Sequence, residues 1–376
     1  MIVAHYCKYL NHHQIGVADE FYRALGNDYY FVVTSYRDKS QLKGGEDYSR
    51  TRKYCILAAE NMDMYKKALE LAAQADVCIF GSNDVEYIRA RTKGDKYLTF
   101  EVSERWMKRG WLNLLSPVLL KNLWLYWTYF RKLSSYKLCQ SAFAAADQHK
   151  LYTYKNRCFK WAYFTATDEE YSKRMWNPSE PIRLLWVARF IKLKHPELVV
   201  ELCNRLKQNS YVFHLDFVGE GDCMDDIKTR VAQYHLQDSV VFHGNIPQHS
   251  VREIMRTSDI FLFTSDQREG WGAVANESMT SGCVIVASDA VGSTPYLVKD
   301  GVNGMVFNNM DVDSLYEKVR YLIDNPSQRF KMSYQAYMDM KYLWNAKTAV
   351  QNFLQLVDDL ESGRACSIME GPCSRA

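Results

Sequence analysis

The chain has 376 residues, of which 47% are hydrophobic and 24% charged, and its formal net charge is only +3. This composition is typical of a folded globular protein and excludes a largely disordered chain. The length exceeds that of one ordinary core and predicts two domains of common size.

The ten cysteines are scattered, without a C-x-x-C pair and without the Cys/His spacing of a zinc site. Two of them, Cys78 and Cys283, interrupt apolar runs of strand length, and we expect them to be small buried side chains. This use of cysteine indicates a reducing compartment. The first residues contain no basic region followed by a long apolar one, so we expect neither a signal peptide nor an anchor there, and a cytoplasmic location.

The first half of the chain alternates strand-like and helix-like segments. Apolar runs of strand length lie at the first residues and at 29–35, 76–82 and 97–103, with helix-like segments at 17–25 and 64–74. Strands that alternate with helices predict a parallel sheet. We therefore expect residues 1–165 to form a Rossmann-like domain.

The second half repeats this alternation more regularly. Strand-like runs lie at 182–189, 212–219, 240–244, 260–265 and 284–288, with helix-like segments at 196–208, 223–235, 249–256 and 273–281. The sequence thus predicts an α/β protein with two Rossmann-like domains whose parallel sheets face a central cleft. The polar stretch 166–181 is the expected linker and hinge.

Helices are also expected near the end of the chain, at 312–324, at 328–341 and as a C-terminal helix over 346–362. The second domain would then cover 182–345, and the C-terminal helix would pack back on the first domain. The last residues, 363–376, contain two glycines and a proline, and this composition predicts a disordered tail.

The stretch "SDQREGWGAVANESMTSG" (265–282) places Glu269 and Glu277 eight positions apart around Gly270 and Gly272. It follows a predicted strand and leads into a predicted helix, where amide hydrogens and the helix dipole favour an anion. A phosphate could then rest on the amides of residues 270–274, with Glu277 reading a ribose and Glu269 the group beyond the phosphates. The alternative is that both acids are solvated charges that favour the helix dipole.

Five segments in fixed order resemble one enzyme family. They are "LLWVARFIKLKHPELVVELCNRL", "FVGEGDCMDDIKTRV", "VVFHGNIP", "IFLFTSDQREGWGAVANESMTSGCVIVASD" and "VKDGVNGMVF", across roughly 182–307. Together they resemble the C-terminal domain of the retaining glycosyltransferases of family GT4 (glycosyl transferases group 1), which have the GT-B fold. The resemblance implies metal-independent transfer of a hexosyl group from a nucleoside diphosphate sugar, which is a co-substrate, and no cofactor.

The resemblance also implies roles for individual residues. Arg189 and Lys194 match the basic pair that neutralises the diphosphate and assists its departure; the alternative is two exposed charges at a helix start. Glu269 matches the first glutamate of the E-x7-E motif, which contacts the donor sugar, and Glu277 matches the second, which holds the ribose. The remaining donor-side positions are Gly219, Gly244, Asn245, Ile246, Gly270, Trp271, Gly272 and Ala273.

One loop departs from the family pattern. Where the family usually has a Gly-Gly turn and a nearby glutamate, this chain has Val291-Gly292 and Pro295-Tyr296. The fold is expected to tolerate this change, whereas the contacts made by the loop are left open.

The resemblance implies that the first domain, 1–165, binds the acceptor, and the candidate residues in it are less specific. A polar turn after the first strand contains His12, His13 and Gly16, and in GT-B enzymes such a turn lies under the donor phosphates. The two histidines could equally cap the helix or be exposed, and no third ligand is spaced nearby to make a zinc site.

Strand ends supply the other acceptor-side candidates. These are Asn83, Glu101, Glu104 and Arg105. Glu104 or Glu101 could position or deprotonate an acceptor hydroxyl. The alternative is that Ser103 and Glu104 begin a helix and carry surface charge.

The segment 111–133 is apolar and aromatic with basic borders, and no uninterrupted apolar run in it approaches the ~20 residues of a membrane span. It lies within 101–160, a region with eleven Lys/Arg against three acidic residues. We expect the segment either to lie on an anionic bilayer, which favours a lipid-linked or glycan-precursor acceptor and peripheral binding to an inner membrane face, or to form a buried helical hairpin.

Two other functions fit the same architecture. A nucleotide-sugar epimerase would need no acceptor platform, and a non-catalytic protein could retain the fold to bind a nucleotide or a polyanion. No acidic D-x-D cluster at a strand end is present to carry a divalent ion with the phosphates. No module for recognising nucleic acid is seen either, so no nucleic-acid partner is expected.

Overall fold

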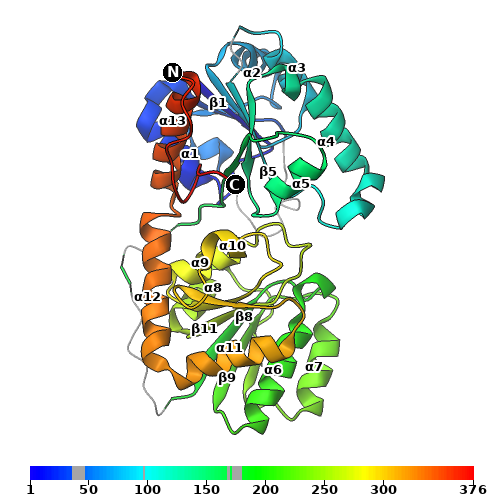
Figure 1. Cartoon of the computed structure of the whole chain (residues 1–376), viewed down its shortest axis with the longest axis vertical. Helices are drawn as coiled ribbons and strands as arrows, with labels where there is room; N and C mark the ends of the chain where they lie inside the picture. The colour runs from blue at the N-terminus through cyan, green and yellow to red at the C-terminus, as the bar shows by residue number, and fades with distance from the viewer. Residues whose placement is uncertain (36–46, 96–97, 167–169, 172–179) are drawn as a thin grey trace. The chain divides into compact units, whose positions relative to one another are not determined.

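The structure is a computed structural model, and it describes residues 1–35, 47–95, 98–166, 170–171 and 180–376. The chain divides into two compact units (Figure 1). The N-terminal unit comprises Met1–Thr165 and Ala346–Ala376, and the C-terminal unit comprises Ala166–Asn345. Most of the predicted linker, 166–181, lies outside the described residues.

The N-terminal unit is built on a parallel sheet with the order β3-β2-β1-β4-β5-β6-β7. Its strands are β1 (Val3–Cys7), β2 (Tyr29–Val33), β3 (Cys55–Leu57), β4 (Val77–Phe80), β5 (Leu98–Ser103), β6 (Ser135–Cys139) and β7 (Cys158–Lys160). The strand order reverses between β1 and β4, the arrangement of a doubly wound fold. The Rossmann-like prediction for this part of the chain is confirmed.

Helices cover this sheet because their apolar faces need burial. They are α1 (Ile15–Leu25), α2 (Met62–Gln74), α3 (Val85–Arg91), α4 (Pro117–Thr128), α5 (Ala144–Lys150) and α13 (Ala346–Glu361), with 3₁₀ turns η1 (Gly26–Asp28), η3 (Ser49–Thr51), η4 (Gly110–Leu115) and η5 (Phe130–Lys132). The core beneath one face joins Ala68 and Ala72 of α2, Leu119 and Leu125 of α4, and Phe80 of β4.

The C-terminal helix belongs to the N-terminal unit. In Figure 1, α13, near the red end of the colour scale, lies beside α1, near the blue end, and the two helices are in contact. Phe353 of α13 packs its ring against Phe21 at 5.3 Å, Phe100 at 4.8 Å and Trp161 at 6.2 Å between ring centroids. The prediction that this helix packs back on the first domain is confirmed.

The prediction of a disordered tail at 363–376 is wrong. Cys373 is fully buried, and its amide donates to the Lys160 carbonyl at 2.8 Å. The Lys160 amide in turn donates to the Ser374 carbonyl at 2.8 Å, and Arg375 forms an antiparallel bridge with β7. Glycine and proline here shape turns that bring the chain against the edge of the sheet, so their presence does not indicate disorder.

The C-terminal unit contains a second parallel sheet, with the order β10-β9-β8-β11-β12-β13. Its strands are β8 (Ile182–Val187), β9 (Phe213–Val218), β10 (Val240–Phe242), β11 (Ile260–Phe263), β12 (Val284–Ser288) and β13 (Gly304–Phe307). Its helical elements are η6 (Lys192–Lys194), α6 (Pro196–Gln208), α7 (Met224–Gln233), α8 (Gln248–Thr257), α9 (Val274–Thr280), α10 (Thr294–Leu297), α11 (Val312–Asp324) and α12 (Pro326–Tyr342). The strand order reverses between β8 and β11, so the loops that leave these two strands lie side by side at the carboxyl edge of the sheet, where open α/β sheets bind ligands.

Candidate functional site

The loops after β8 and β11 are joined by an ion pair between Lys194 and Glu269. Both side chains are largely buried, with exposed fractions of 13% and 15%. The backbone is tied as well, because the Asp266 amide donates to the Leu193 carbonyl at 3.0 Å and the Thr264 hydroxyl to the Lys194 carbonyl at 2.7 Å. The C-terminal unit therefore brings together two predicted site residues that are 75 positions apart in the sequence.

Arg189 lies two residues after β8 ends and is exposed on the same edge. The amide of Ile191 donates to the carbonyl of Arg189 at 2.8 Å, and the amide of Phe190 to the carbonyl of Glu220 at 2.9 Å. The segment that carries both predicted cations is thus fixed to the loop after β9, while the guanidinium stays available to an anion.

The loop before α9 is shaped by Gly272 and Trp271. Gly272 has a φ of +78°, and a Cβ at this position would lie 2.2 Å from Cζ of Phe263. Trp271 is fully buried, and its indole nitrogen donates to Asn276 at 2.8 Å. The Trp271 side chain consequently supports the loop from inside, and only its backbone is left for the predicted donor contact. Gly270 is buried and Ala273 half-buried at the start of α9, whose first amides have no acceptor within the helix.

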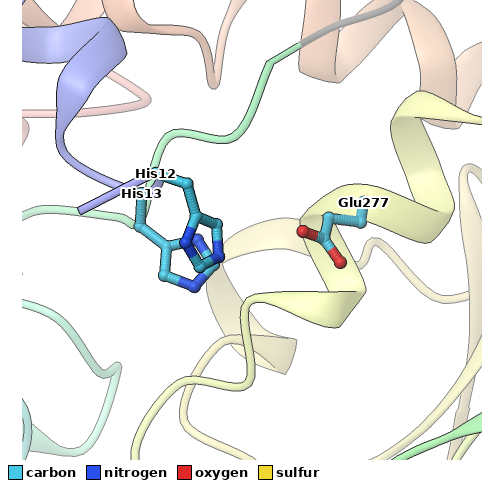
Figure 2. A group of neighbouring side chains, drawn as sticks. All are labelled: His12, His13 and Glu277. Carbon is cyan, nitrogen blue, oxygen red and sulfur yellow. The ribbon is translucent and has the colours of Figure 1, made fainter. Parts of the chain in front are cut away.

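Glu277 projects from α9, as Figure 2 shows. Its carboxylate accepts a hydrogen bond from Gln248 of α8 at 3.0 Å, and its carbonyl accepts one from Arg252 at 2.7 Å. The same guanidinium nitrogen of Arg252 also contacts the Thr280 hydroxyl at 2.7 Å. These contacts fix the position of the second glutamate of the motif against α8.

The loops after β9 and β10 meet through predicted donor-side residues. Gly219 has a φ of +123°, and a Cβ there would lie 2.0 Å from the Ala188 carbonyl oxygen, so only glycine fits. Its amide donates to the Gly244 carbonyl at 2.9 Å, and Asn245 donates to Glu220 at 2.9 Å. Ile246, in the loop after β10, is half-buried.

Sequence reasoning missed His195, which follows Lys194 directly. Its Nδ1 lies 2.7 Å from Glu197 and its Nε2 3.1 Å from Asp266. Burial alone would lower the pKa of His195, but the hydrogen bonds with Glu197 and Asp266 outweigh burial and raise the pKa above its ordinary value. A signal existed in the sequence, since "KHPEL" places a non-glycine residue where the chain must turn sharply into a helix that begins with proline.

In the N-terminal unit, His12 and His13 form the turn before α1 that Figure 2 shows; Glu277 in the same picture belongs to the other unit. The two imidazole centroids are 3.7 Å apart, and the His13 amide donates to Asn11 at 2.9 Å. His13 lines a cavity of about 130 Å³. Burial first, and the charge of His12 second, lower the pKa of His13 to about 3, so this ring is neutral near pH 7. Gly16 follows at the start of α1.

The interpretation of Glu101 as an acceptor-side group is wrong. Glu101 is 1% exposed and forms an ion pair with Lys137, which is itself fully buried. The Lys137 ammonium also lies 4.1 Å from the centroid of the Trp106 ring and 2.7 Å from the Ser103 hydroxyl. Because β5 is covered on both faces, its end does not present this carboxylate to an acceptor.

The neighbouring candidates are differently placed. Arg105 is bound to the buried Asp147 through two nitrogens, at 3.0 and 3.2 Å, so it serves the structure of the loop. Glu104 pairs with Lys108 and accepts a hydrogen bond from Tyr163 at 3.2 Å, while remaining partly exposed. Of the two predicted acids, Glu101 and Glu104, Glu104 is therefore the one that an acceptor could reach.

Asn83 contacts Asn122 of α4 at 2.7 Å. Asn83 lies in the loop after β4, and Asn122, which is 8% exposed, lies in α4. Asn83 thus positions α4, and its role toward an acceptor stays a prediction.

The segment 111–133 has two apolar faces. Leu119 and Leu125 of α4 are 2% and 1% exposed and pack in the core. On the other side, large apolar residues are exposed, namely Trp111, Leu112, Leu114, Leu115, Val118, Leu120, Trp124 and Trp127. We call these eight residues the outer apolar face. No helix among the described residues has the length and hydrophobicity needed to cross a membrane.

Comparison with known proteins agrees with this geometry. Residues 167–339, nearly all of the C-terminal unit, match the family described as Glycosyl transferases group 1. The predicted resemblance to the glycosyl transferases group 1 is thereby confirmed. The amylovoran biosynthesis glycosyltransferase AmsK of Erwinia amylovora is 31% identical over 141 residues, which cover 36% of this chain and 34% of AmsK. The poly(glycerol-phosphate) alpha-glucosyltransferase of Bacillus subtilis is 26% identical over 168 residues, covering 44% of this chain and 24% of that protein. These two matches thus span about a third, or less, of each relative's own length.

Solved structures resemble the chain over nearly its whole length. The crystal structure of HepE from Anabaena in complex with UDP has a TM-score of 0.69 at 13% identity, covering 96% of this chain and 100% of HepE. A glycosyltransferase from Rickettsia africae has a TM-score of 0.66 at 14% identity, covering 96% and 98% of the two chains. At this identity the likeness shows the fold, and the prediction of a GT-B fold with two Rossmann-like domains is confirmed.

Proposed function

We propose that the chain is a glycosyltransferase that moves a sugar from a nucleoside diphosphate sugar to a hydroxyl acceptor, with retention at the anomeric carbon. The observation that carries the proposal is the Lys194–Glu269 pair, held beside the glycine loop at the point where the strand order reverses. The glycosyltransferase names of the relatives support it, as do the structures of HepE with UDP and with UDP-glucose.

The difficult step is breakage of the bond between the anomeric carbon and the diphosphate oxygen. Arg189 and Lys194 would compensate the negative charge that develops on the leaving diphosphate, together with the amides at the start of α9. In the free protein, Glu269 holds the Lys194 ammonium in place. On donor binding, the ammonium would contact the phosphates, and Glu269 would accept hydrogen bonds from the sugar. Glu277 would hold the ribose.

The chemistry needs no metal ion in this scheme, because side-chain cations and amides supply the positive charge. The acceptor oxygen then forms the new bond on the face that the diphosphate has left. Its proton must pass to a base, and Glu104 of the N-terminal unit is our candidate. His12, His13 and Gly16 remain candidates for contacts near the donor and acceptor.

Removal of Lys194 tests these roles. We expect Lys194→Ala to lower the rate of transfer by roughly 10²–10³-fold, the usual cost of losing one preorganised partner of a leaving charge. The matched control is Lys318→Ala, because Lys318 also forms an ion pair in the C-terminal unit, with Asp300, but on α11. Equal rates for the two variants would contradict the role of Lys194.

The donor class is tested by thermal unfolding of the wild-type protein with a panel of nucleotide sugars. A donor at a hundred times its dissociation constant stabilises the protein by about 2.7 kcal/mol. Uridine diphosphate sugars are the first to test, because HepE was solved with UDP-glucose. If no nucleotide sugar raised the melting temperature, the proposal would fail. Retention is tested separately, by NMR of the product, which shows the configuration at the anomeric carbon.

We further propose that the acceptor is a lipid-linked glycan precursor presented at an anionic membrane, which the outer apolar face contacts. Helix α4 is fixed to the core by Leu119 and Leu125, so Leu120, Trp124 and Trp127 stay outward. Basic residues accompany this face: Lys121 lies on α4 and is exposed, and Arg131, also exposed, lies 5.3 Å from the centroid of the Trp127 ring. Apolar and aromatic side chains with flanking cations suit the headgroup region of an anionic bilayer.

Flotation with vesicles tests this contact. We expect the protein to bind vesicles of phosphatidylcholine and phosphatidylglycerol more strongly than phosphatidylcholine alone. Leu120→Asp should weaken binding by at least about tenfold, because burial of a leucine side chain is worth roughly 1.5–3 kcal/mol. Val212→Asp is the control, since Val212 is also an exposed aliphatic residue but belongs to the C-terminal unit. The membrane contact is refuted if the two variants bind alike.

A further inference from the structure

His195 has an unusual backbone conformation. Its φ and ψ are +49° and +53°, in the left-handed region, at the residue that precedes the first turn of α6. Side chains with a Cβ avoid this region, and glycine is the usual choice. A non-glycine residue in this region carries backbone strain that other contacts must offset, and strained residues are frequent at functional sites.

The imidazole of His195 is held by two acids from different elements. Glu197, in the first turn of α6, lies 2.7 Å from Nδ1, and Asp266, in the loop after β11, lies 3.1 Å from Nε2. Asp266 is itself fixed by Arg268, whose Nε lies 2.9 Å from one carboxylate oxygen and whose amide donates to the other at 2.8 Å. The Asp266 carboxylate is 8% exposed, so solvent competes weakly for these contacts.

Both ring nitrogens therefore face oxygens that only accept hydrogen bonds. A neutral imidazole has one N–H and one lone pair, so it could satisfy one carboxylate and would turn a lone pair toward the other. Only the imidazolium donates to both. The geometry thus selects the protonated ring, and each contact is a charge-assisted hydrogen bond.

The ring ties together the two loops that carry the proposed catalytic pair. Lys194 is the residue just before His195, and its carbonyl accepts from Thr264, while the Leu193 carbonyl accepts from the Asp266 amide. The contact of His195 with Asp266 adds a side-chain link between the same two segments. Loss of the proton would remove one of the two acidic contacts and free the turn that precedes α6.

We propose that His195 is a positioning residue, which as an imidazolium joins the loop of Lys194 to the loop of Glu269 and thereby makes the affinity for the nucleoside diphosphate depend on pH. The inference rests on the proposed function for its ligand. The two contacts of His195 with Glu197 and Asp266, which we call the clamp, do not depend on that function, because they exist without a ligand.

The direction of the pH effect follows from the groups around the ring. The acids facing it are Glu197 and Asp266. The Asp266 carboxylate contacts Arg268, and the Glu197 carboxylate lies near Arg230. The pKa of His195 is raised in the folded state. The clamp is then complete below the ordinary histidine value of about 6.5 and opens as the pH rises through the higher folded pKa. Affinity for the diphosphate should fall over that interval.

The experiment uses His195→Gly, which accepts the left-handed backbone without strain and removes only the ring. Its matched control is His235→Gly, because His235 also has a positive φ, +54°, but is exposed on the turn after α7, at the amino edge of the sheet. The probe is UDP, titrated by calorimetry at several pH values on either side of the histidine range.

We expect wild type and His235→Gly to share one profile, in which UDP affinity falls at least threefold as the pH rises through the titration of His195. His195→Gly should bind UDP about tenfold more weakly at low pH and show no such fall. An unchanged affinity and an unchanged profile in His195→Gly would overturn the proposal.

A second readout needs no ligand. Hydrogen exchange of the amides of η6 and His195, corrected for the intrinsic base-catalysed rise, should speed up in wild type and in His235→Gly as the pH rises through the imidazole titration, and should be fast at all pH values in His195→Gly. If wild type bound neither UDP nor any other nucleoside diphosphate but exchange behaved in this way, the proposed function would fail and the clamp would stand. Exchange that is the same in all three proteins would refute the clamp.

Discussion

Gly272→Ala is the sharpest test of the loop that lies between Glu269 and Glu277. Two costs add at this position. A Cβ at a φ of +78° costs roughly 1–2 kcal/mol in backbone strain. The methyl group would also lie 2.2 Å from Cζ of Phe263, a residue that is 4% exposed, and such overpacking costs about 1–3 kcal/mol.

The expected total is therefore about 2–5 kcal/mol of lost unfolding free energy. Gly301→Ala is the matched control, because Gly301 has a φ of +75° in the same unit and a Cβ there meets nothing within 4 Å. Urea unfolding of the two variants, compared at equal slope, isolates the clash with Phe263 as a difference of roughly 1–3 kcal/mol. If Gly272→Ala lost no more stability than Gly301→Ala, the reasoning that the Phe263 ring fixes this loop would be refuted.

Three further outcomes are expected. Glu101→Gln should cost about 3–5 kcal/mol in urea unfolding, because it leaves the Lys137 ammonium buried without its anion; a loss under 1 kcal/mol would contradict the buried pair. Leu119→Ala should cost about 2–5 kcal/mol in the same assay, whereas Leu120→Ala, at an exposed position of the same helix, should change stability by under about 0.5 kcal/mol, and equal losses would contradict the two-faced helix. Thermal unfolding should show a contribution of His195 that is full below about pH 6.5 and lost as the pH rises through its raised folded pKa, and a stability that rises over this interval would contradict the sign.

Regular elements were predictable wherever one periodicity dominated. The helices at 196–208 and 312–324 and the strand at 284–288 have the predicted bounds, because each combines a clear apolar pattern with a recognisable start. The strand β6 was not predicted, since its middle residue, Lys137, reads as polar and is buried only through its pairing with Glu101. Pattern alone cannot foresee a charge that is neutralised by a partner 36 positions away.

The site residues also fall into those that the sequence could predict and those that it could not. Lys194 and Glu269 were found because their motifs carry them, and the sheet brings them together. The role of His195 could not be derived, because one of its two partners, Asp266, lies 71 positions away and the contact exists only once β8 and β11 are adjacent. Glu101 was misplaced for the related reason that a strand end in sequence does not say which faces of the sheet are covered.

The composition of the N-terminal unit from two separate stretches, Met1–Thr165 and Ala346–Ala376, has a consequence for synthesis on the ribosome. Residues 166–345 are continuous and can fold as soon as they emerge. The earlier stretch has to wait for α13, because Phe353 supplies the aromatic side chain that Phe21, Phe100 and Trp161 surround. The stretch that is translated first thus completes its fold last. Until α13 is made, the aromatic side chains that contact Phe353 would be open to a chaperone on the nascent chain.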